Sequence, residues 1–138
     1  MKTYSSASCE ISYHIIWCSK YRKKILKDDV GNYFKNVIEV ICESKNWEII
    51  EKEIMPDHIH IFISVPPYDS PTNIVKVLKG ISARQLYKKF PELKFGLRRG
   101  HIWSPSYYVG TAGNMSAETI KKYIQNQTKS PPRNSPTH

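Results

Sequence analysis

The chain has 138 residues, of which 40% are hydrophobic and 24% are charged. This length and composition predict one globular domain with a hydrophobic core, and they exclude a fibrous or wholly disordered protein. The formal net charge at pH 7 is +9, which indicates a polyanionic partner without identifying it.

The positive charge is concentrated in the second half of the sequence. Residues 1–69 contain 9 basic and 10 acidic side chains, whereas residues 70–138 contain 12 basic side chains and only Glu92 and Glu118 as acids. This asymmetry favours a basic face that binds nucleic acid. A membrane surface, an acidic protein or no partner at all are the alternatives.

The three cysteines, Cys9, Cys18 and Cys42, are too few and too irregularly spaced for a disulfide framework or a CxxC metal site. We expect them to be buried, reduced thiols. The N-terminal segment lacks the apolar core of a signal peptide, and no apolar run approaches the ~18 residues that a membrane span needs. The sequence therefore predicts a cytoplasmic protein without a membrane partner.

The first half of the chain alternates between strand and helix patterns. Alternating apolar residues predict a strand from Cys9 to Cys18, which is followed by a basic segment. A helical periodicity from Val30 to Ile41 predicts an amphipathic helix, and Asp28 or Asp29 can cap it.

A hairpin and three further elements follow. The extended patterns of Trp47–Met55 and His58–Val65 are separated by Pro56 and Asp57, which favour a turn, so the two predict a hairpin. The remaining elements are a helix starting at Ser70 or Thr72 and running toward Phe90, a strand His101–Thr111, and a helix from about Ala117 to Gln127 with Ser116 as its cap.

The order of these elements, β-α-β-β-α-β and a last helix, predicts an α+β fold of the ferredoxin-like (split βαβ) type. Its four-stranded antiparallel sheet carries two helices on one face, and the first and third strands are its central neighbours. The additional C-terminal helix has no place in the core arrangement. Residues 1–127 are expected to form the single domain, and residues 128–138 a mobile tail.

Two histidines stand out on the third predicted strand. His58 and His60 are two residues apart, so their side chains share one face, while Ile59, Ile61 and Ile63 occupy the other. Neutral imidazoles placed in this way can hold a divalent metal ion together. The alternative is a pair of structural histidines on a half-solvated sheet face.

The last predicted helix carries a second candidate group. Ile120, Tyr123, Ile124 and Gln127 recur on one helix face. If the two isoleucines pack on the sheet, Tyr123 and Gln127 lie next to whatever the sheet presents there. The alternative is that Tyr123 is a core residue with its hydroxyl at the edge.

Four segments together have the order and spacing of a known family. They are Tyr13–Trp17 with Lys20–Arg22, Met55–His60, Trp103–Val109 and Ile120–Gln127. In these segments the chain resembles the HUH-type single-tyrosine transposases of insertion sequences that move as single-stranded DNA, the TnpA type and its REP-associated relatives. The likeness covers nearly the whole chain, from about Tyr13 to Gln127.

The resemblance implies a role for each residue that matches. His58 and His60 would bind Mg²⁺ or Mn²⁺, and Gln127 would supply a third, oxygen-bearing ligand. Tyr123 would be the nucleophile that cleaves single-stranded DNA, forming a 5′-phosphotyrosine link and releasing a 3′-hydroxyl. The resemblance also implies recognition of a subterminal DNA hairpin. It further implies a homodimer in which the tyrosine helix of one subunit completes the histidine site of the other.

Basic and aromatic side chains are the candidate DNA contacts. The basic candidates are Lys20, Arg22, Lys23, Lys24, Lys27, Lys76, Lys79, Arg98, Arg99, Lys121 and Lys122. The aromatic candidates, Trp103, Tyr107 and Tyr108, could stack on bases or belong to the core.

Other functions are compatible with the same residues. A domesticated HUH nuclease that acts on repeated palindromes would share the same site residues. A ferredoxin-like nucleic-acid-binding module without catalysis would use the histidines and Tyr123 as structural residues, and an inactive or metal-storing relative is a third possibility.

Overall fold

The computed structural model describes residues 10–94, 101–111 and 117–126. In chain order the elements are β1 (Ile11–Cys18), η1 (Lys20–Arg22), α1 (Asp28–Ser44), β2 (Glu48–Met55), β3 (His58–Val65), α2 (Pro71–Lys89), η2 (Pro91–Lys94), β4 (Tyr108–Thr111) and α3 (Ala117–Asn126).

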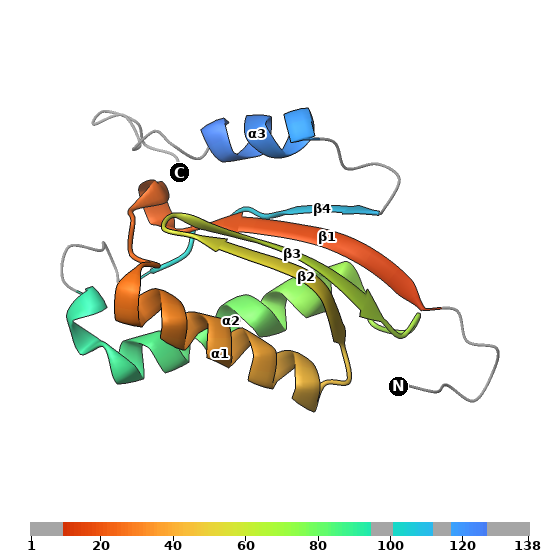
Figure 1. Cartoon of the computed structure of the whole chain (residues 1–138), viewed down its shortest axis with the longest axis horizontal. Helices are drawn as coiled ribbons and strands as arrows, with labels where there is room; N and C mark the ends of the chain where they lie inside the picture. The colour runs from red at the N-terminus through yellow and green to blue at the C-terminus, as the bar shows by residue number, and fades with distance from the viewer. Residues whose placement is uncertain (1–9, 95–100, 112–116, 127–138) are drawn as a thin grey trace.

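The strands form one antiparallel sheet in the order β2-β3-β1-β4. Helices α1 and α2 cover one face of this sheet, and α3 lies over the other face (Figure 1). The predicted α+β fold, with its ferredoxin-like strand order and with β1 and β3 as central neighbours, is confirmed.

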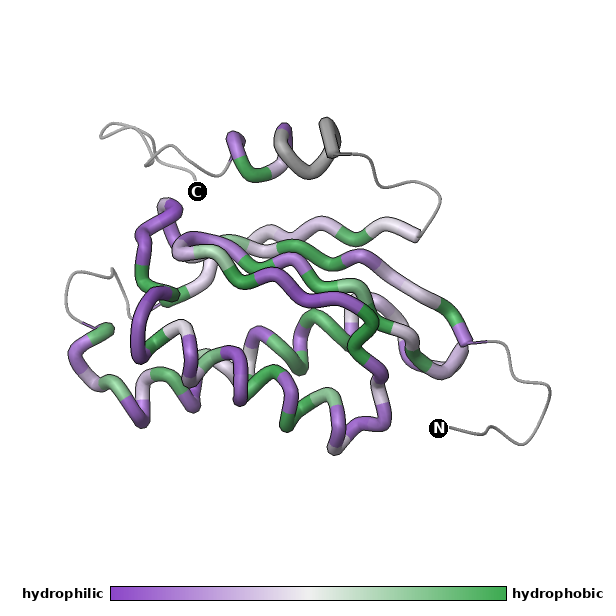
Figure 2. Tube along the Cα trace, viewed as in Figure 1, coloured by the Kyte–Doolittle hydropathy of each residue, from purple (hydrophilic) through white to green (hydrophobic). Residues whose placement is uncertain are grey.

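The main core lies between the sheet and helices α1 and α2. Alternate residues of the central strands point into it, and Ile15, Trp17, Ile59, Ile61 and Ile63 are completely buried there. Figure 2 shows the resulting alternation of hydrophobic and hydrophilic positions along the strands. This alternation leaves the opposite face of β3 to the histidines.

The opposite face of the sheet is also covered in part. Ile16 and Cys18 point away from the main core, because they alternate with Ile15 and Trp17, yet both are 0% exposed. Figure 1 places α3 over this face. The helix that had no place in the core arrangement therefore has an apolar surface to pack on.

The fourth strand is shorter than predicted. The pattern of His101–Thr111 predicted a continuous strand, but β4 begins only at Tyr108, and before it Trp103 forms an isolated bridge with Ser19. Pro105 lacks an N–H and cannot donate a ladder hydrogen bond, which explains the break. The interrupted segment becomes part of the candidate site described below.

The helix starts were predicted with mixed success. Ser70 caps α2, since its hydroxyl accepts a hydrogen bond from the Asn73 N–H at 3.1 Å, as predicted. Neither aspartate caps α1: the N-cap position is Lys27, without a side-chain cap, and both aspartates lie in the first turn. There their charges interact favourably with the helix dipole instead. Ser116, Cys9 and the predicted tail lie outside the described residues.

Within the described parts of the chain, no helix combines the length and the apolar character that crossing a membrane would require.

Candidate active site

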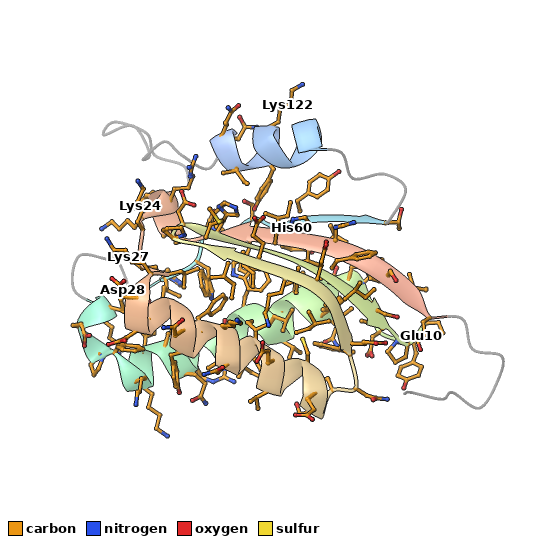
Figure 3. All side chains as sticks on the ribbon, in the orientation of Figure 1. Glu10, Lys24, Lys27, Asp28, His60 and Lys122 are labelled. Atoms are coloured by element: carbon orange, nitrogen blue, oxygen red, sulfur yellow. The ribbon has the colours of Figure 1, made fainter. Side chains whose placement is uncertain are left out.

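The two histidines of β3 lie on the face of the sheet that α3 covers. His58 and His60 are half-buried, whereas Ile59 and Ile61 between and beyond them are completely buried on the other side. Figure 3 shows His60 on the side of the sheet turned toward α3. The face predicted for the histidine pair from strand periodicity is therefore confirmed.

Strand register places His60 near the centre of the sheet. Glu53 of β2, His60, Ile16 of β1 and Tyr108 of β4 follow one another across the four strands. On the β2 side, a hollow of about 400 Å³ is lined by residues that include Glu53, His60 and Phe62. The imidazole of His60 is thus next to open space as well as to the covered centre of the face.

Asp57 orients the ring of His58. The Nδ1 atom of His58 donates a hydrogen bond to Oδ1 of Asp57 at 2.8 Å, and the Arg22 Nε donates to the other carboxylate oxygen at 2.7 Å. Burial opposes ionisation of Asp57, but the hydrogen bonds and charges of His58 and Arg22 together outweigh it and hold the pKa of the carboxyl below its usual value. Because Nδ1 is occupied, Nε2 is the nitrogen of His58 that is left to bind another group.

A third histidine contacts His60. The Nδ1 atom of His14 on β1 lies 2.9 Å from Nε2 of His60, and the His14 ring stacks on Phe62 with centroids 4.1 Å apart. Burial lowers the pKa of both imidazoles, and the neighbouring His14 ring lowers the pKa of His60 further. His14 was not predicted as a site residue, although its position in the alternation of β1 already placed it on this face.

The described residues contribute an incomplete set of metal donors. Among them, no group of three or more His, Cys, Asp or Glu side chains could hold a metal ion, and Gln127 lies outside the described part of the chain. His58 and His60 remain as two nitrogen donors on one face. The hydrogen bond from the second ring nitrogen of His58 to a carboxylate is an arrangement common among metal-binding histidines, so the pair fits a divalent ion.

Tyr123 of α3 points toward the sheet and contacts the interrupted segment before β4. Its hydroxyl lies 3.2 Å from the Ser106 hydroxyl, and its ring lies 6.1 Å from that of Tyr108 in an edge-on contact. Burial raises the pKa of Tyr123 to about 12, although the hydrogen bond with Ser106 opposes this effect. The phenol is therefore fully protonated at neutral pH in this position.

Lys79 supports the same segment from α2. Its ammonium group donates to the carbonyl oxygens of Ser104 at 2.7 Å and Ser106 at 3.3 Å, and burial lowers its pKa to about 8. The sequence had suggested Lys79 only as a DNA contact. Instead, the lysine holds the backbone next to the hydroxyl that contacts Tyr123.

The other predicted DNA contacts differ in their placement. Lys23, Lys24, Lys27, Lys76 and Lys122 are exposed, and Figure 3 shows Lys122 on the outer side of α3. Lys20 is half-buried, with its ammonium 5.5 Å from the centre of the Tyr21 ring. Arg98, Arg99 and the side chain of Lys121 lie outside the described residues.

The aromatic candidates also divide. Trp103 is 7% exposed and its indole N–H donates to the Lys79 carbonyl at 3.2 Å, so it belongs to the core. Tyr107 is 37% exposed and Tyr108 is half-buried beneath Tyr123.

A ferredoxin-like sheet with paired histidines on a central strand, opposite a helix that carries a tyrosine, defines the class of HUH-type single-tyrosine proteins. A family model described as "Transposase IS200 like" matches residues 7–127. The chain belongs to this family of Y1 transposases, which are enzymes that cleave DNA and transfer its strands.

Individual relatives agree with this membership. The chain is 38% identical over 118 residues to the ISDra2 transposase TnpA of Deinococcus radiodurans, a match that covers 86% of this chain and 84% of the relative. It is 34% identical over 126 residues to the transposase for insertion sequence element IS200 of Salmonella typhimurium, covering 91% and 82% of the two chains.

Solved structures are similar to this fold as well. The crystal structure of a candidate transposase from Deinococcus radiodurans has a TM-score of 0.86 and 35% identity, and the match covers 94% of this chain and 100% of the other. A REP-associated tyrosine transposase bound to a REP hairpin has a TM-score of 0.55 and 15% identity, covering 90% and 68% of the two chains. This second likeness is one of fold alone.

Proposed function

We propose that this transposase cleaves and rejoins single-stranded DNA at insertion-sequence ends, with Tyr123 as its nucleophile. The observation that carries the proposal is the placement of Tyr123 on α3, above the sheet face that presents His58 and His60. Family membership supplies the reaction class, and a tyrosine facing a histidine pair supplies the groups that this reaction needs.

The proposed reaction exchanges one phosphodiester for another. The phenolic oxygen of Tyr123 bonds to phosphorus, the bond from phosphorus to the 3′-oxygen breaks, and the released 3′-hydroxyl gains the proton that the phenol loses. A 5′-phosphotyrosine link results. The 3′-hydroxyl of another end then attacks this link and regenerates the tyrosine, so that no nucleotide cofactor is consumed.

We assign the metal to His58, His60 and Gln127, and the ion to Mg²⁺ or Mn²⁺. A divalent ion there would withdraw charge from the scissile phosphate and assist the leaving 3′-oxygen. Asp57 holds the His58 ring in the orientation that leaves Nε2 for the ion, and His14 restrains His60 from the neighbouring strand. Imidazole nitrogen is a softer ligand than Mg²⁺ prefers, which favours Mn²⁺ in binding strength.

We also propose that the protein recognises a subterminal DNA hairpin and that it acts as a homodimer. A REP hairpin is bound by a protein of the same fold, and the exposed lysines around η1, together with Lys76 and Lys122, would supply salt-sensitive phosphate contacts. The homodimer would exchange α3 between subunits, so that α3 of one subunit takes the same place over the histidine face of the other.

The proposal is tested with single-stranded DNA that carries candidate element ends and a label at its 3′ end. In Mn²⁺, the label should become attached to the protein in a denaturing gel, whereas the same DNA labelled at its 5′ end should yield only free fragments. Tyr123→Phe should abolish the adduct. Tyr108→Phe, which removes the neighbouring phenol, is the matched control and should retain it.

A different result would contradict the proposal in an informative way. Hairpin binding without an adduct on any end sequence indicates a binding module without catalysis. Cleavage of palindromes without rejoining of element ends indicates a domesticated nuclease.

A further inference from the structure

Arg22 has an unusual position at the end of β1. Tyr21 and Arg22 have φ angles of 56° and 53°, in the left-handed region that side chains with a Cβ rarely adopt. Two consecutive strained residues persist only where surrounding contacts hold them. From this backbone the guanidinium of Arg22 reaches inward to its partners, and 25% of its side chain remains exposed.

The guanidinium joins two elements that are distant in the sequence. Its Nε donates to Oδ2 of Asp57 at 2.7 Å, in the turn just before β3, and its NH1 group donates to the backbone carbonyl of Ile124 on α3 at 3.3 Å. The other oxygen of Asp57 accepts the hydrogen bond from His58. One continuous set of hydrogen bonds therefore connects the histidine strand to the residue that follows Tyr123.

The type of contact suits a positioning role. Arg22 binds a backbone carbonyl of α3, so the contact depends on where the helix lies and not on which side chain it carries. A guanidinium presents several donors in a planar fork and can serve two acceptors in different directions, whereas a lysine ammonium acts more nearly as a single point of charge. The carboxylate partner is 6% exposed, so this ion pair is shielded from solvent and from screening by salt.

We propose that Arg22 is a positioning residue that fastens α3 to the histidine strand through Asp57. The arginine keeps Tyr123 over the sheet, and the carboxylate that anchors the arginine also orients His58. The importance of this link for the reaction rests on the proposed function, because the proposed function assigns the chemistry to Tyr123 and the metal to His58. The attachment of α3 does not depend on that chemistry.

The experiment measures amide hydrogen exchange of the full chain, without DNA or metal. In Arg22→Gln, exchange in α3 should accelerate by about tenfold, because the contact that closes the helix onto the sheet is lost. Exchange in β1 and β3 should stay unchanged, which shows that the fold is intact. Lys23→Gln removes the same charge one residue further on and should leave α3 exchange unchanged.

Two more variants separate this role from a phosphate contact. Arg22→Lys keeps the positive charge, so it should restore hairpin binding if Arg22 contacts DNA, but it should not restore slow exchange in α3. Asp57→Asn should accelerate α3 exchange as Arg22→Gln does, and the double variant should be no faster than either single one. If Arg22→Gln fails to fold, Asp57→Asn carries the test.

A second readout follows the tyrosine itself. With ¹³C at Cζ of tyrosine, the pKa of Tyr123 should fall in Arg22→Gln and Arg22→Lys from about 12, because a loosened helix exposes the phenol to water. Unchanged α3 exchange and an unchanged Tyr123 pKa, together with weaker hairpin binding that lysine rescues, would overturn the proposal. A missing DNA adduct would overturn the proposed function and leave these results standing.

Discussion

The hydroxyl of Ser106 lies 3.2 Å from the phenolic oxygen of Tyr123 and connects the proposed nucleophile to a segment that Lys79 holds by its backbone. Pro105 interrupts the strand at this point. As a result, the backbone carbonyls of Ser104 and Ser106 accept hydrogen bonds from Lys79, and the Ser106 hydroxyl lies beside Tyr123.

Ser106→Ala should raise the pKa of Tyr123 further, since burial already raises it and the Ser106 hydrogen bond is the contact that lowers it. Single-turnover cleavage should slow by about tenfold, the effect of one lost hydrogen bond on a reacting group. Ser104→Ala is the control, because the Ser104 hydroxyl contacts that of Ser106 at 3.5 Å and not the phenol. Equal rates for the two variants would contradict a role for the Ser106 hydroxyl.

His14→Phe should weaken Mn²⁺ binding by roughly 10- to 100-fold, the range found when a group that orients a metal ligand is removed. Phenylalanine retains a ring to stack on Phe62 but removes the nitrogen that contacts His60 at 2.9 Å. Titration of Mn²⁺ followed by electron paramagnetic resonance measures the change.

Hairpin affinity is the control in that experiment. It should be unchanged in His14→Phe, and likewise in His58→Ala and His60→Ala, because the exposed lysines lie elsewhere. Parallel loss of metal and hairpin binding would mean that the histidines support the fold.

Cys18 and Lys79 should affect the pH dependence of stability in opposite directions. Burial raises the pKa of the Cys18 thiol from 9.0 to about 12, so the unfolded chain loses this proton first and stability falls as pH rises above 9.0. Burial lowers the pKa of Lys79 from 10.5 to about 8. Between these two pH values the unfolded chain still holds the proton that the folded chain has lost, so stability rises with pH.

The variants isolate each contribution. Urea unfolding at a series of pH values above 9.0 should show stability rising with pH in Cys18→Ala, relative to the parent protein, and falling in Lys79→Met. The same slope in all three proteins would contradict the burial of these two groups.

The two helical glycines should respond to alanine with opposite signs. A Cβ on Gly31 would lie 2.8 Å from the Leu26 carbonyl oxygen, so Gly31→Ala should destabilise the fold by about 1–3 kcal/mol. A Cβ on Gly80 meets nothing closer than the Arg84 guanidinium at 3.8 Å, so Gly80→Ala should stabilise α2 by about 0.5–1 kcal/mol. Urea unfolding measures both, and destabilisation by Gly80→Ala would be the contrary result.

Several features of the molecule could be predicted because their physical cause is local. The alternation of His58, His60 and the intervening isoleucines depends only on strand geometry, and β3 spans His58–Val65 as predicted. Ser70 caps α2 because its hydroxyl can reach an N–H within the next turn. The aspartates of α1 have the same local preference, but the chain enters that helix at Lys27.

Other features depended on contacts between distant residues. Charge alone marked Arg22 and Lys79 as DNA contacts, but both donate hydrogen bonds to internal acceptors from other elements, at Asp57, Ile124, Ser104 and Ser106. The sequence contains no periodicity that pairs such residues. Folding brings them together. A buried cation loses its hydrating water, so a hydrogen bond to an internal acceptor is more favourable than burial without an acceptor.

The charged residues show the same division between what local sequence determines and what tertiary contacts determine. By itself the sequence determined the net charge of +9, the alternation of the strands, the histidine face and the resemblance that directs attention to Tyr123, because these follow from residue type and short-range spacing. Only the tertiary structure decided which cations face solvent and which hold the site together. It also decided that His14 meets His60 and that Ser106 meets Tyr123. The reason is physical: strand pairing and helix docking set the distances between residues far apart in the chain, and hydrogen bonds form only at those distances.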